Sequence, residues 1–273
     1  MSDDEHEAKP VRDRSQVTII DIARMAEVSK KTVSRVINES PLVREETRKK
    51  VKRIIAETGF TPNPQARALA FRKSFLIGLV YDNPSPQYVV NMQRGILDTL
   101  GDTAFQLVLR PCDRGEEGYR ERVRSFILQH KPHGIILTPS VSEDEELAEI
   151  LREEQCDYVR IASLELDIPS RSIRTHDAQG AEMAAAHLAQ LGHKRIGHIH
   201  GPKTFRSAHE RLSGFKRGLE GYGLELAPEL TVEGAYTFDS GVTSATRLLN
   251  RHDRPTAIFA GNDEMAVGVY VAA

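Results

Sequence analysis

TIIDIARMAEVSKKTVSRVIN, residues 18–38, is the stretch from which the organisation of the chain follows. Its apolar residues recur at the spacing of two short helices separated by a tight turn at residues 26–28. Thr18 and Asp21 form the pattern of a capping box, and Ser29 is placed to cap the second helix. The pattern therefore predicts a helix-turn-helix unit near the N-terminus.

The second predicted helix has two chemically different sides. Val33, Val36 and Ile37 fall on one side, at the spacing of a buried helical face. The other side carries basic and hydroxyl side chains, namely Lys30, Lys31, Thr32, Ser34 and Arg35. Such donors suit the major groove of DNA, where they meet base edges and phosphates. An ordinary helical hairpin with a solvated basic face is the alternative for this stretch taken alone.

Charge is distributed unevenly along the 273 residues, although the net charge is only −2. Residues 17–74 contain 13 Lys and Arg against 6 Asp and Glu, whereas residues 75–273 contain 21 against 28. A basic N-terminal module on an acidic body predicts that only the module meets a polyanion.

Composition places the chain among cytoplasmic globular proteins. Residues 1–16 are charged and lack an apolar segment, so they are predicted to be a disordered tail and not a secretory signal. No apolar run approaches the ~20 residues of a membrane span. Cys112 and Cys156 are far apart in the sequence and are expected to be reduced thiols, with a disulfide as the alternative.

Two further helical segments follow the first pair. Residues 45–58 predict a third helix that ends at Gly59 and completes a DNA-binding domain at residues 17–61. In residues 62–74, Asn63 can cap a short helix that begins at Pro64. This helix is too short to be stable alone, so it is predicted to be a hinge that folds on binding. A simple linker is the alternative.

From residue 75 onward, short apolar runs alternate with helical patterns. Strands are predicted at residues 75–81, 105–110, 133–138, 157–162, 172–175, 195–200, 230–234 and 256–261. Helices are predicted at residues 89–100, 118–130, 143–153, 178–191, 209–222, 241–250 and from 263 on. This alternation predicts parallel sheets with right-handed crossovers, in two lobes at about residues 75–163 and 172–273. Ligands bind beyond the carboxyl ends of the strands in such sheets.

The order of these motifs resembles the LacI/GalR family of bacterial transcription regulators. The resemblance covers residues 17–273, with VTIIDIARMAEVSKKTVSRVIN as its most specific part. Other matching stretches are GFTPNPQARALA, LIGLV, HGIILTPS, HLAQLGHKRIGHIHGP, SAHERLSGF and PTAIFAGNDEMAVG. The resemblance implies a lambda-repressor-like helix-turn-helix domain, followed by a bilobed α/β domain of the type I periplasmic-binding-protein kind.

This resemblance implies a homodimer that binds a palindromic operator in double-stranded DNA. Lys30, Lys31 and Arg35 are the implied base-reading residues. Leu69 is the implied apolar wedge in the central minor groove, where Ala66 lies beside it. The implied phosphate or supporting contacts come from Thr18, Ser29, Thr32, Ser34, Asn38 and Asn63.

The resemblance also implies a small-molecule effector, most simply a sugar, in a cleft between the lobes, and no cofactor. The implied effector-binding residues are Asp82, Asn83, Tyr88, Thr138, Phe205, Ser207, Arg211, Tyr236, Asn262 and Asp263. Arg and Asp side chains offer the donors and acceptors that sugar hydroxyls or nucleobases need. An ion pair between Arg211 and Asp263 across the two lobes is the structural alternative.

Several positions depart from the family pattern. Glu27 occupies a turn position usually held by Gly, and Arg44 replaces a Ser cap. His176 and Asp177 stand where the family usually has Asp and Asn, which leaves the identity of the ligand open. Family members usually continue for some sixty residues beyond NDEMAVG, so the second lobe is expected to be incomplete and to expose a sheet edge.

Other chemistries are weaker readings of the sequence. His193, His198 and His200 lie near one strand, but no Cys or carboxylate joins them at ligand spacing, so no metal site is predicted. No nucleophile elbow or phosphate loop is found, so an enzyme is not predicted. The remaining alternatives are a solute-binding protein of the same architecture that does not bind DNA, and a truncated product that is impaired in dimerisation.

Overall fold

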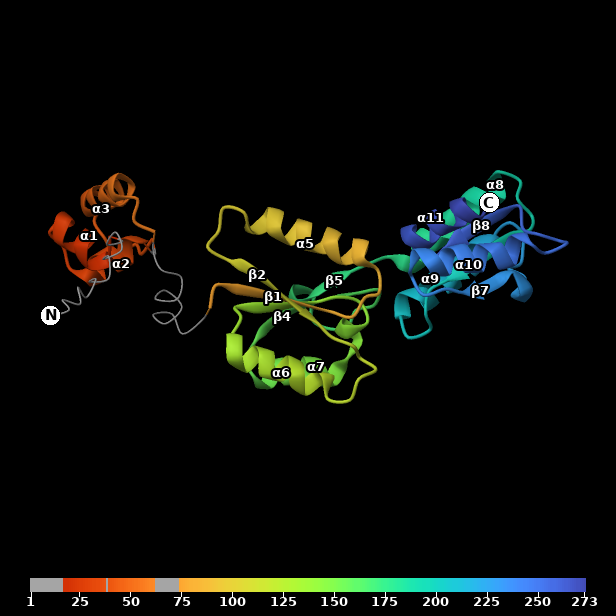
Figure 1. Ribbon diagram of the computed structural model, residues 1–273, viewed down its shortest axis with the longest axis horizontal. Coiled ribbons are helices and arrows are strands. Elements are labelled where there is room, and N and C mark those ends of the chain that lie inside the picture. Colours follow the sequence, from red (N-terminus) through yellow and green to blue (C-terminus); the bar gives the residue numbers. More distant parts are fainter. Residues whose placement is uncertain (1–16, 38, 62–73) are drawn as a thin grey trace, which may run out of the picture. The chain divides into compact units, whose positions relative to one another are not determined.

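The computed structural model describes residues 17–37, 39–61 and 74–273 (Figure 1). Contacts divide the chain into two units between residues 72 and 73. We call residues 17–61 the head and residues 74–273 the body. The expectations for the tail, for Asn38 and for the hinge with Asn63, Ala66 and Leu69 fall outside the described residues.

The head consists of three helices, as the sequence predicts. They are α1 (Ile19–Ala26), α2 (Lys30–Ile37) and α3 (Glu45–Thr58). The predicted capping box is confirmed, because Thr18 Oγ1 accepts the Asp21 N–H and the Asp21 carboxylate accepts the Thr18 N–H at 3.0 Å. The helices enclose a small apolar core whose most buried members are Ile22, Val33, Val36 and Val51.

Both departures noted in the head have structural consequences. Glu27 ends α1 in the left-handed region, at φ 55°, where a side chain is strained and glycine is not. Arg44 precedes α3 without a side-chain hydrogen bond to the helix. The acidic first turn of α3, Glu45 and Glu46, still complements the helix dipole.

The first lobe of the body is built on a five-stranded parallel sheet in the order β2-β1-β3-β4-β5. Its strands are β1 (Leu76–Tyr81), β2 (Gln106–Pro111), β3 (Gly134–Leu137), β4 (Asp157–Ala162) and β5 (Ser172–Arg174). Its helices are α5 (Pro86–Leu100), α6 (Tyr119–His130) and α7 (Glu145–Glu153), with short 3₁₀ turns η1 (Val141–Glu143) and η2 (Pro169–Arg171).

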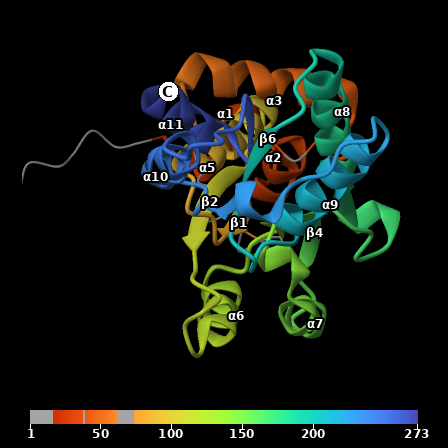
Figure 2. The ribbon, with the colours of Figure 1, turned by 90° about the vertical axis from the view of Figure 1, so that its right-hand side faces the viewer.

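The two faces of this sheet are covered differently. Helix α5 lies on one face, and α6 and α7 lie side by side on the other (Figures 1 and 2). The main core forms under α6 and α7, where Val123 and Leu147 meet Val80 and Leu137 of the strands. Under α5 only Val89 of the helix is buried, so that face is the less tightly covered one.

Arg160 is a buried cation on the strand face that carries this core, and only 1% of its surface is exposed. Its Nε donates to the Ser142 carbonyl at 2.7 Å, and its Nη1 donates to Glu145 at 2.8 Å and to the Leu166 carbonyl at 3.2 Å. These partners satisfy much of the charge that burial would otherwise penalise. Arg160 thereby ties η1 and the loop after β4 to the sheet.

The second lobe has a three-stranded parallel sheet in the order β7-β6-β8. Its strands are β6 (Ile196–His200), β7 (Thr231–Glu233) and β8 (Ala257–Ala260), and a 3₁₀ turn, η3 (Pro228–Leu230), precedes β7. Its helices are α8 (Asp177–Gln190), α9 (Arg206–Glu220), α10 (Phe238–Leu249) and α11 (Asp263–Ala272). The pair α8–α9 covers one face of the sheet and the pair α10–α11 covers the other.

Helices α8 and α9 approach so closely that their contact requires glycine. A Cβ added to Gly214 would lie 1.9 Å from the Ala178 carbonyl oxygen, and one added to Gly218 would lie 2.5 Å from that of Glu182. Both distances are far inside van der Waals contact, so no side chain fits at these two positions. We call this contact the glycine seam.

The predicted α/β order is confirmed, and several boundaries differ. Helices α5, α9 and α10 begin three residues before the predicted positions 89, 209 and 241. Ser85 and Thr237 cap α5 and α10 with their side chains, and these two caps were not used in the prediction. Strand β5 pairs with β4, so the expected start of the second lobe at residue 172 falls inside the first sheet.

None of the helices in the described part of the chain combines the length and apolarity needed to cross a bilayer.

Candidate nucleic-acid and effector sites

The outer side of α2 presents a group of cations. Lys30 and Lys31 are exposed, and Arg35, Thr32 and Ser34 are half-buried on the same helix. Among the described residues no ion pair involves Lys30, Lys31 or Arg35. Ser29 begins this helix, because its Oγ accepts the Thr32 N–H at 3.1 Å.

Most cations elsewhere in the head have acidic partners; Arg44 and Lys49 are the exceptions among the described residues. Lys50 pairs with Glu27 at 3.4 Å, and Lys52 pairs with Glu39 at 3.5 Å. Further pairs join Arg24 to Asp21, Arg48 to Glu45 and Arg53 to Glu57. Helix α2, which the sequence predicts to meet DNA, therefore carries three of the five cations of the described head that have no acidic partner.

A cleft of about 610 Å³ opens at the carboxyl ends of strands from both sheets of the body. Its walls come from the start of α5, the start of α8, the first turns of α9, and the β8–α11 connection. Seven of the ten predicted effector-binding residues line it: Asn83, Tyr88, Ser207, Arg211, Tyr236, Asn262 and Asp263. This is the position at which parallel α/β sheets bind ligands.

Three predicted residues lie elsewhere. Asp82 and Phe205 line an adjoining hollow of about 730 Å³ together with Cys112 and Arg114. Burial raises the pKa of Asp82, which accepts the Arg114 N–H at 3.3 Å. Thr138 is only 1% exposed and lines neither hollow, because the end of β3 turns it inward. Asp82 and Thr138 therefore lie apart from the walls of the cleft, whereas the Phe205 ring packs edge-on against the Tyr236 ring behind it, with centroids 5.4 Å apart.

Arg211 forms the principal ion pair of the cleft, and its partner was not predicted. Its Nε donates to Asp177 Oδ1 at 2.8 Å and its Nη2 lies 2.6 Å from the same oxygen. Its Nη1 donates to the Gly261 carbonyl. The alternative of an ion pair between Arg211 and Asp263 across the lobes is wrong. Arg211 pairs with Asp177 instead, and Asp263 begins α11 in the same lobe as Arg211.

Tyr236 is held in a strained position beside this pair. Its φ is 61°, and its side chain is only 4% exposed. The ring fills the space above Gly201, where an added Cβ would lie 2.0 Å from the ring carbon Cζ. The Tyr236 carbonyl accepts from Asn262 Nδ2 at 2.9 Å, which helps to hold the backbone. Strain retained at a cavity wall is a mark of a functional position.

Burial also keeps the phenol groups of the cleft protonated. It raises the pKa of Tyr88 to about 12, and the nearby charge of Asp177 adds to the effect. The pKa of Tyr236 is raised by burial as well. Both hydroxyls therefore remain neutral hydrogen-bonding groups at physiological pH.

The two lobes touch at one edge of the cleft. Ser85 Oγ donates to Glu264 Oε1 at 2.5 Å, and the Gln87 N–H donates to the same oxygen at 3.2 Å. Ser85 also caps α5 by accepting the Tyr88 N–H at 3.2 Å. Glu264 of the second lobe thus binds the start of a helix in the first lobe, where the helix dipole favours a carboxylate.

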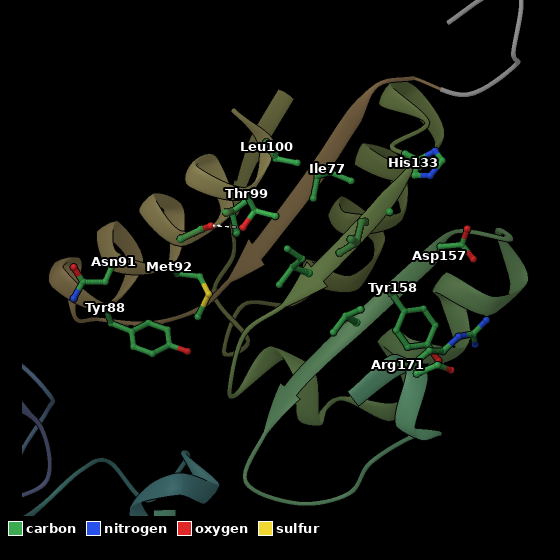
Figure 3. Close-up of a pocket in the computed structure, with 17 residues that line it drawn as sticks. Ile77, Tyr88, Asn91, Met92, Thr99, Leu100, His133, Asp157, Tyr158 and Arg171 are labelled. Atoms are coloured by element: carbon green, nitrogen blue, oxygen red, sulfur yellow. Dashed lines mark hydrogen bonds between the residues drawn. The ribbon is translucent and has the colours of Figure 1, made fainter. Parts of the chain in front are cut away.

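A larger cavity, of about 910 Å³, lies between α5 and the less tightly covered face of the first sheet (Figure 3). Most of its walls are aliphatic, including Ile77, Met92 and Leu100. It runs along the sheet face and not across the strand ends. Only Tyr88 and Asn91, at the start of α5, belong to both this cavity and the cleft.

The histidines near β6 have separate partners. His193 Nδ1 lies 2.9 Å from Thr256 Oγ1, His198 Nδ1 lies 2.9 Å from the Phe259 carbonyl, and His200 Nδ1 lies 2.7 Å from that of Gly201. Within residues 17–37, 39–61 and 74–273, no group of three or more His, Cys, Asp or Glu is arranged to hold a metal ion.

His198 lies fully inside the second lobe, beside the stacked rings of Phe215 and Phe259. Its pKa is lowered to about 4, mainly by burial and in part by the positive charges of His200, Arg211 and Lys216. The imidazole is therefore neutral at physiological pH.

Asp177, Ser85 and Glu264 are among the cleft residues that sequence reasoning missed. Asp177 was noted only as a departure from a family pattern. The rule that ligands lie beyond strand ends could have identified it, because it follows β5 directly and begins α8. Glu264 and Ser85 carry no such signal, since they meet only when the lobes are folded.

Comparison with known protein families gives two matches, one for each unit of the chain. Residues 18–63 match "Bacterial regulatory proteins, lacI family", and residues 74–273 match "Periplasmic binding proteins and sugar binding domain of LacI family". The catabolite control protein A of Priestia megaterium is 35% identical over 254 residues, which cover 93% of this chain and 76% of that protein. The ribose operon repressor of Escherichia coli is 30% identical over 256 residues, covering 93% and 77%.

Solved structures give the same result. A lac repressor dimer bound to operator and the anti-inducer ONPF aligns with a TM-score of 0.71 at 28% identity, over 94% of this chain and 77% of that one. The transcriptional regulator CelR in complex with cellobiose aligns with a TM-score of 0.62 at 29% identity, again over 94% and 77%.

Proposed function

The chain belongs to the LacI family of bacterial regulatory proteins, and from this membership we propose which of its surfaces bind DNA and effector. It is a DNA-binding transcriptional regulator and not an enzyme. The match over the head favours this function over a solute-binding protein that does not contact DNA.

We propose that α2 enters the major groove of a palindromic operator and that two copies of the chain read its two halves. The single observation that carries this proposal is the row of cations on α2 without acidic partners among the described residues. Lys30, Lys31 and Arg35 would read base edges and phosphates. Thr18, Ser29, Thr32 and Ser34 would position the helix on the backbone, in the cytoplasmic nucleoid where the operator lies.

We propose that the cleft binds a small sugar effector. Support comes from the polar residues at the strand ends, from the strained Tyr236, and from relatives whose names refer to ribose and cellobiose. Effector binding would change how the lobes meet, and so would shift the population that can grip the operator. A shift from 1:99 to 99:1 requires a preference of about 5.5 kcal/mol for one state.

Selection of bound duplexes from random DNA tests the DNA proposal. We expect enrichment of a two-fold symmetric sequence, because two identical heads impose their symmetry on the site. Enrichment of no sequence, at both low and moderate salt, would refute operator recognition by α2. A thermal-shift screen of sugars with the same full chain tests the effector proposal separately.

A further inference from the structure

The charged groups that line the cleft are unevenly matched. Of the described residues in its walls, Arg211 is the one permanent cation, whereas Asp177, Asp263 and Glu264 are acidic. The cleft therefore carries more negative than positive charge. An anionic ligand would enter against this excess, in a region where the protein lowers the effective dielectric constant.

Three of the five N–H groups of the Arg211 guanidinium already face protein oxygens. Asp177 takes up Nε and Nη2, and the Gly261 carbonyl takes up Nη1. The Asp177 side chain is only 8% exposed, and its other oxygen accepts from Thr175 Oγ1 at 2.5 Å. The Arg211 side chain is 30% exposed, but its charge is already compensated by a buried carboxylate that is held from two sides, so a phosphate or carboxylate would gain little from approaching it.

The acidic groups are also engaged or turned outward. Glu264 accepts from Ser85 and Gln87, and Asp263 is exposed at the first turn of α11. What the cleft offers to a ligand are uncharged groups. These are the Tyr88 hydroxyl, the amides of Asn83 and Asn91, and the Ser207 and Tyr236 hydroxyls, which lie 3.5 Å apart and can each make a further hydrogen bond.

We infer that the cleft selects an uncharged, hydroxyl-rich ligand and rejects phosphorylated or carboxylated analogues, because Asp177 has neutralised the only cation that could bind them. The inference rests on the proposed function of the cleft as the effector site. Asp177 thereby acts as a specificity-determining residue, because its pairing with Arg211 excludes negatively charged ligands.

Inorganic phosphate is the direct probe, because it carries the rejected charge and needs no knowledge of the effector. The melting temperature of the full chain is measured with phosphate at millimolar concentrations against chloride at equal ionic strength. We expect no phosphate-specific stabilisation of the wild type. In Asp177→Asn, which keeps the shape and leaves the charge of the guanidinium uncompensated, we expect phosphate to bind at least tenfold more tightly.

Asp263→Asn is the matched control, since it removes the same charge from the same cleft without uncovering Arg211. It should change phosphate binding by less than threefold. Saturable stabilisation of the wild type by phosphate would overturn the inference, as would equal phosphate affinities of the two variants. If Asp177→Asn does not fold, the wild-type measurement still decides the matter.

Pairs of ligands then separate this inference from the proposed function. The wild type is titrated with glucose and glucose 6-phosphate, ribose and ribose 5-phosphate, and glucose and glucuronate. Binding of a neutral member alone supports both proposals. Tighter binding of a charged member overturns the charge inference and leaves the effector proposal standing. Rejection of phosphate together with no binding by any neutral sugar refutes the sugar effector while the charge inference holds.

Discussion

The outer side of α2 and the cleft of the body use the same residue types in opposite ways. On α2, Lys30, Lys31 and Arg35 have no acidic partner among the described residues, whereas five of the seven other cations of residues 17–61 are paired. In the cleft, Arg211 is bound by Asp177 and by a backbone carbonyl. An unpaired cation attracts a polyanion, but a paired one serves to shape a cavity.

The difference teaches that the charge of a residue does not reveal its role until its partners are known. Surface cations with no partner displace the counterions that are condensed on DNA, so they contribute affinity that depends on the salt concentration. A cation held by a carboxylate contributes geometry and excludes other anions. The head and the body should therefore respond differently to salt, to pH and to the same substitutions.

The largest expected effect comes from removing the cations of α2 together. Lys30→Ala, Lys31→Ala and Arg35→Ala in one chain should weaken operator binding about a thousandfold, or roughly 4 kcal/mol, because each contact contributes about 1–3 kcal/mol. Binding to a selected operator is measured over a range of salt concentrations, and the salt dependence should flatten. Arg53→Ala, a paired cation on α3, is the control and should change affinity by less than about threefold. Equal losses in the two chains would contradict the assignment of α2.

Arg160 and Arg35 provide a matched pair of substitutions for stability. Arg160→Met should destabilise the body by about 3 kcal/mol, because it removes a buried cation and leaves the Ser142 and Leu166 carbonyls unpaired. Arg35→Met should change stability by less than about 0.5 kcal/mol and should still impair DNA binding. Denaturant unfolding of both variants measures the contrast. Comparable stability losses would show that Arg35 has a structural partner after all.

The pH dependence of stability should separate body from head. His198 has a pKa of about 4 when folded and about 6.5 when unfolded, so the unfolded chain binds the additional proton as pH falls below 6.5. The contribution of neutral His198 to the free energy of unfolding is fully present above that pH and is lost as the pH falls towards 4, with about 2 kcal/mol lost by pH 5. His198→Phe, which keeps an aromatic ring beside Phe215 and Phe259, should remove this step. Since the described residues 17–61 contain no histidine, unfolding of the head should not show it.

The smallest expected effect concerns the turn that aims α2. Glu27→Gly should stabilise the head by about 1 kcal/mol, because glycine adopts a φ of 55° without the strain of a side chain. The exposed pair with Lys50 that is lost contributes little. Glu57→Gly, in the last turn of α3, is the matched control and should destabilise by up to 1 kcal/mol. Thermal unfolding of the two variants should therefore shift in opposite directions.

Much of the fold could be predicted from local patterns. The caps at Thr18 and Ser29, the apolar side of α2 and the alternation of strands with helices each depend on neighbours within a few residues. The helix starts at Pro86 and Phe238 were placed too late because a polar cap, and not the first apolar residue, marks the beginning of a helix. Strand β5 was placed in the wrong lobe because its partner is fixed by tertiary pairing.

The candidate site could be predicted less completely. The family resemblance pointed to seven residues that line the cleft, but not to the pairing of Arg211 with Asp177, which lie 34 residues apart. The contact of Ser85 with Glu264 spans 179 residues and has no local signature. Residue type and position can therefore suggest which side chains line a cleft, while the charge that it presents depends on contacts that form only on folding.

The glycine seam has a mechanical consequence. Because Gly214 and Gly218 let the backbones of α8 and α9 touch, these two helices cannot slide or tilt independently without a steric clash. Asp177 belongs to α8 and Arg211 to α9. A ligand that displaces either side chain should therefore move the two helices as one rigid unit. A displacement of these helices at the cleft should then be transmitted to their far ends with little loss.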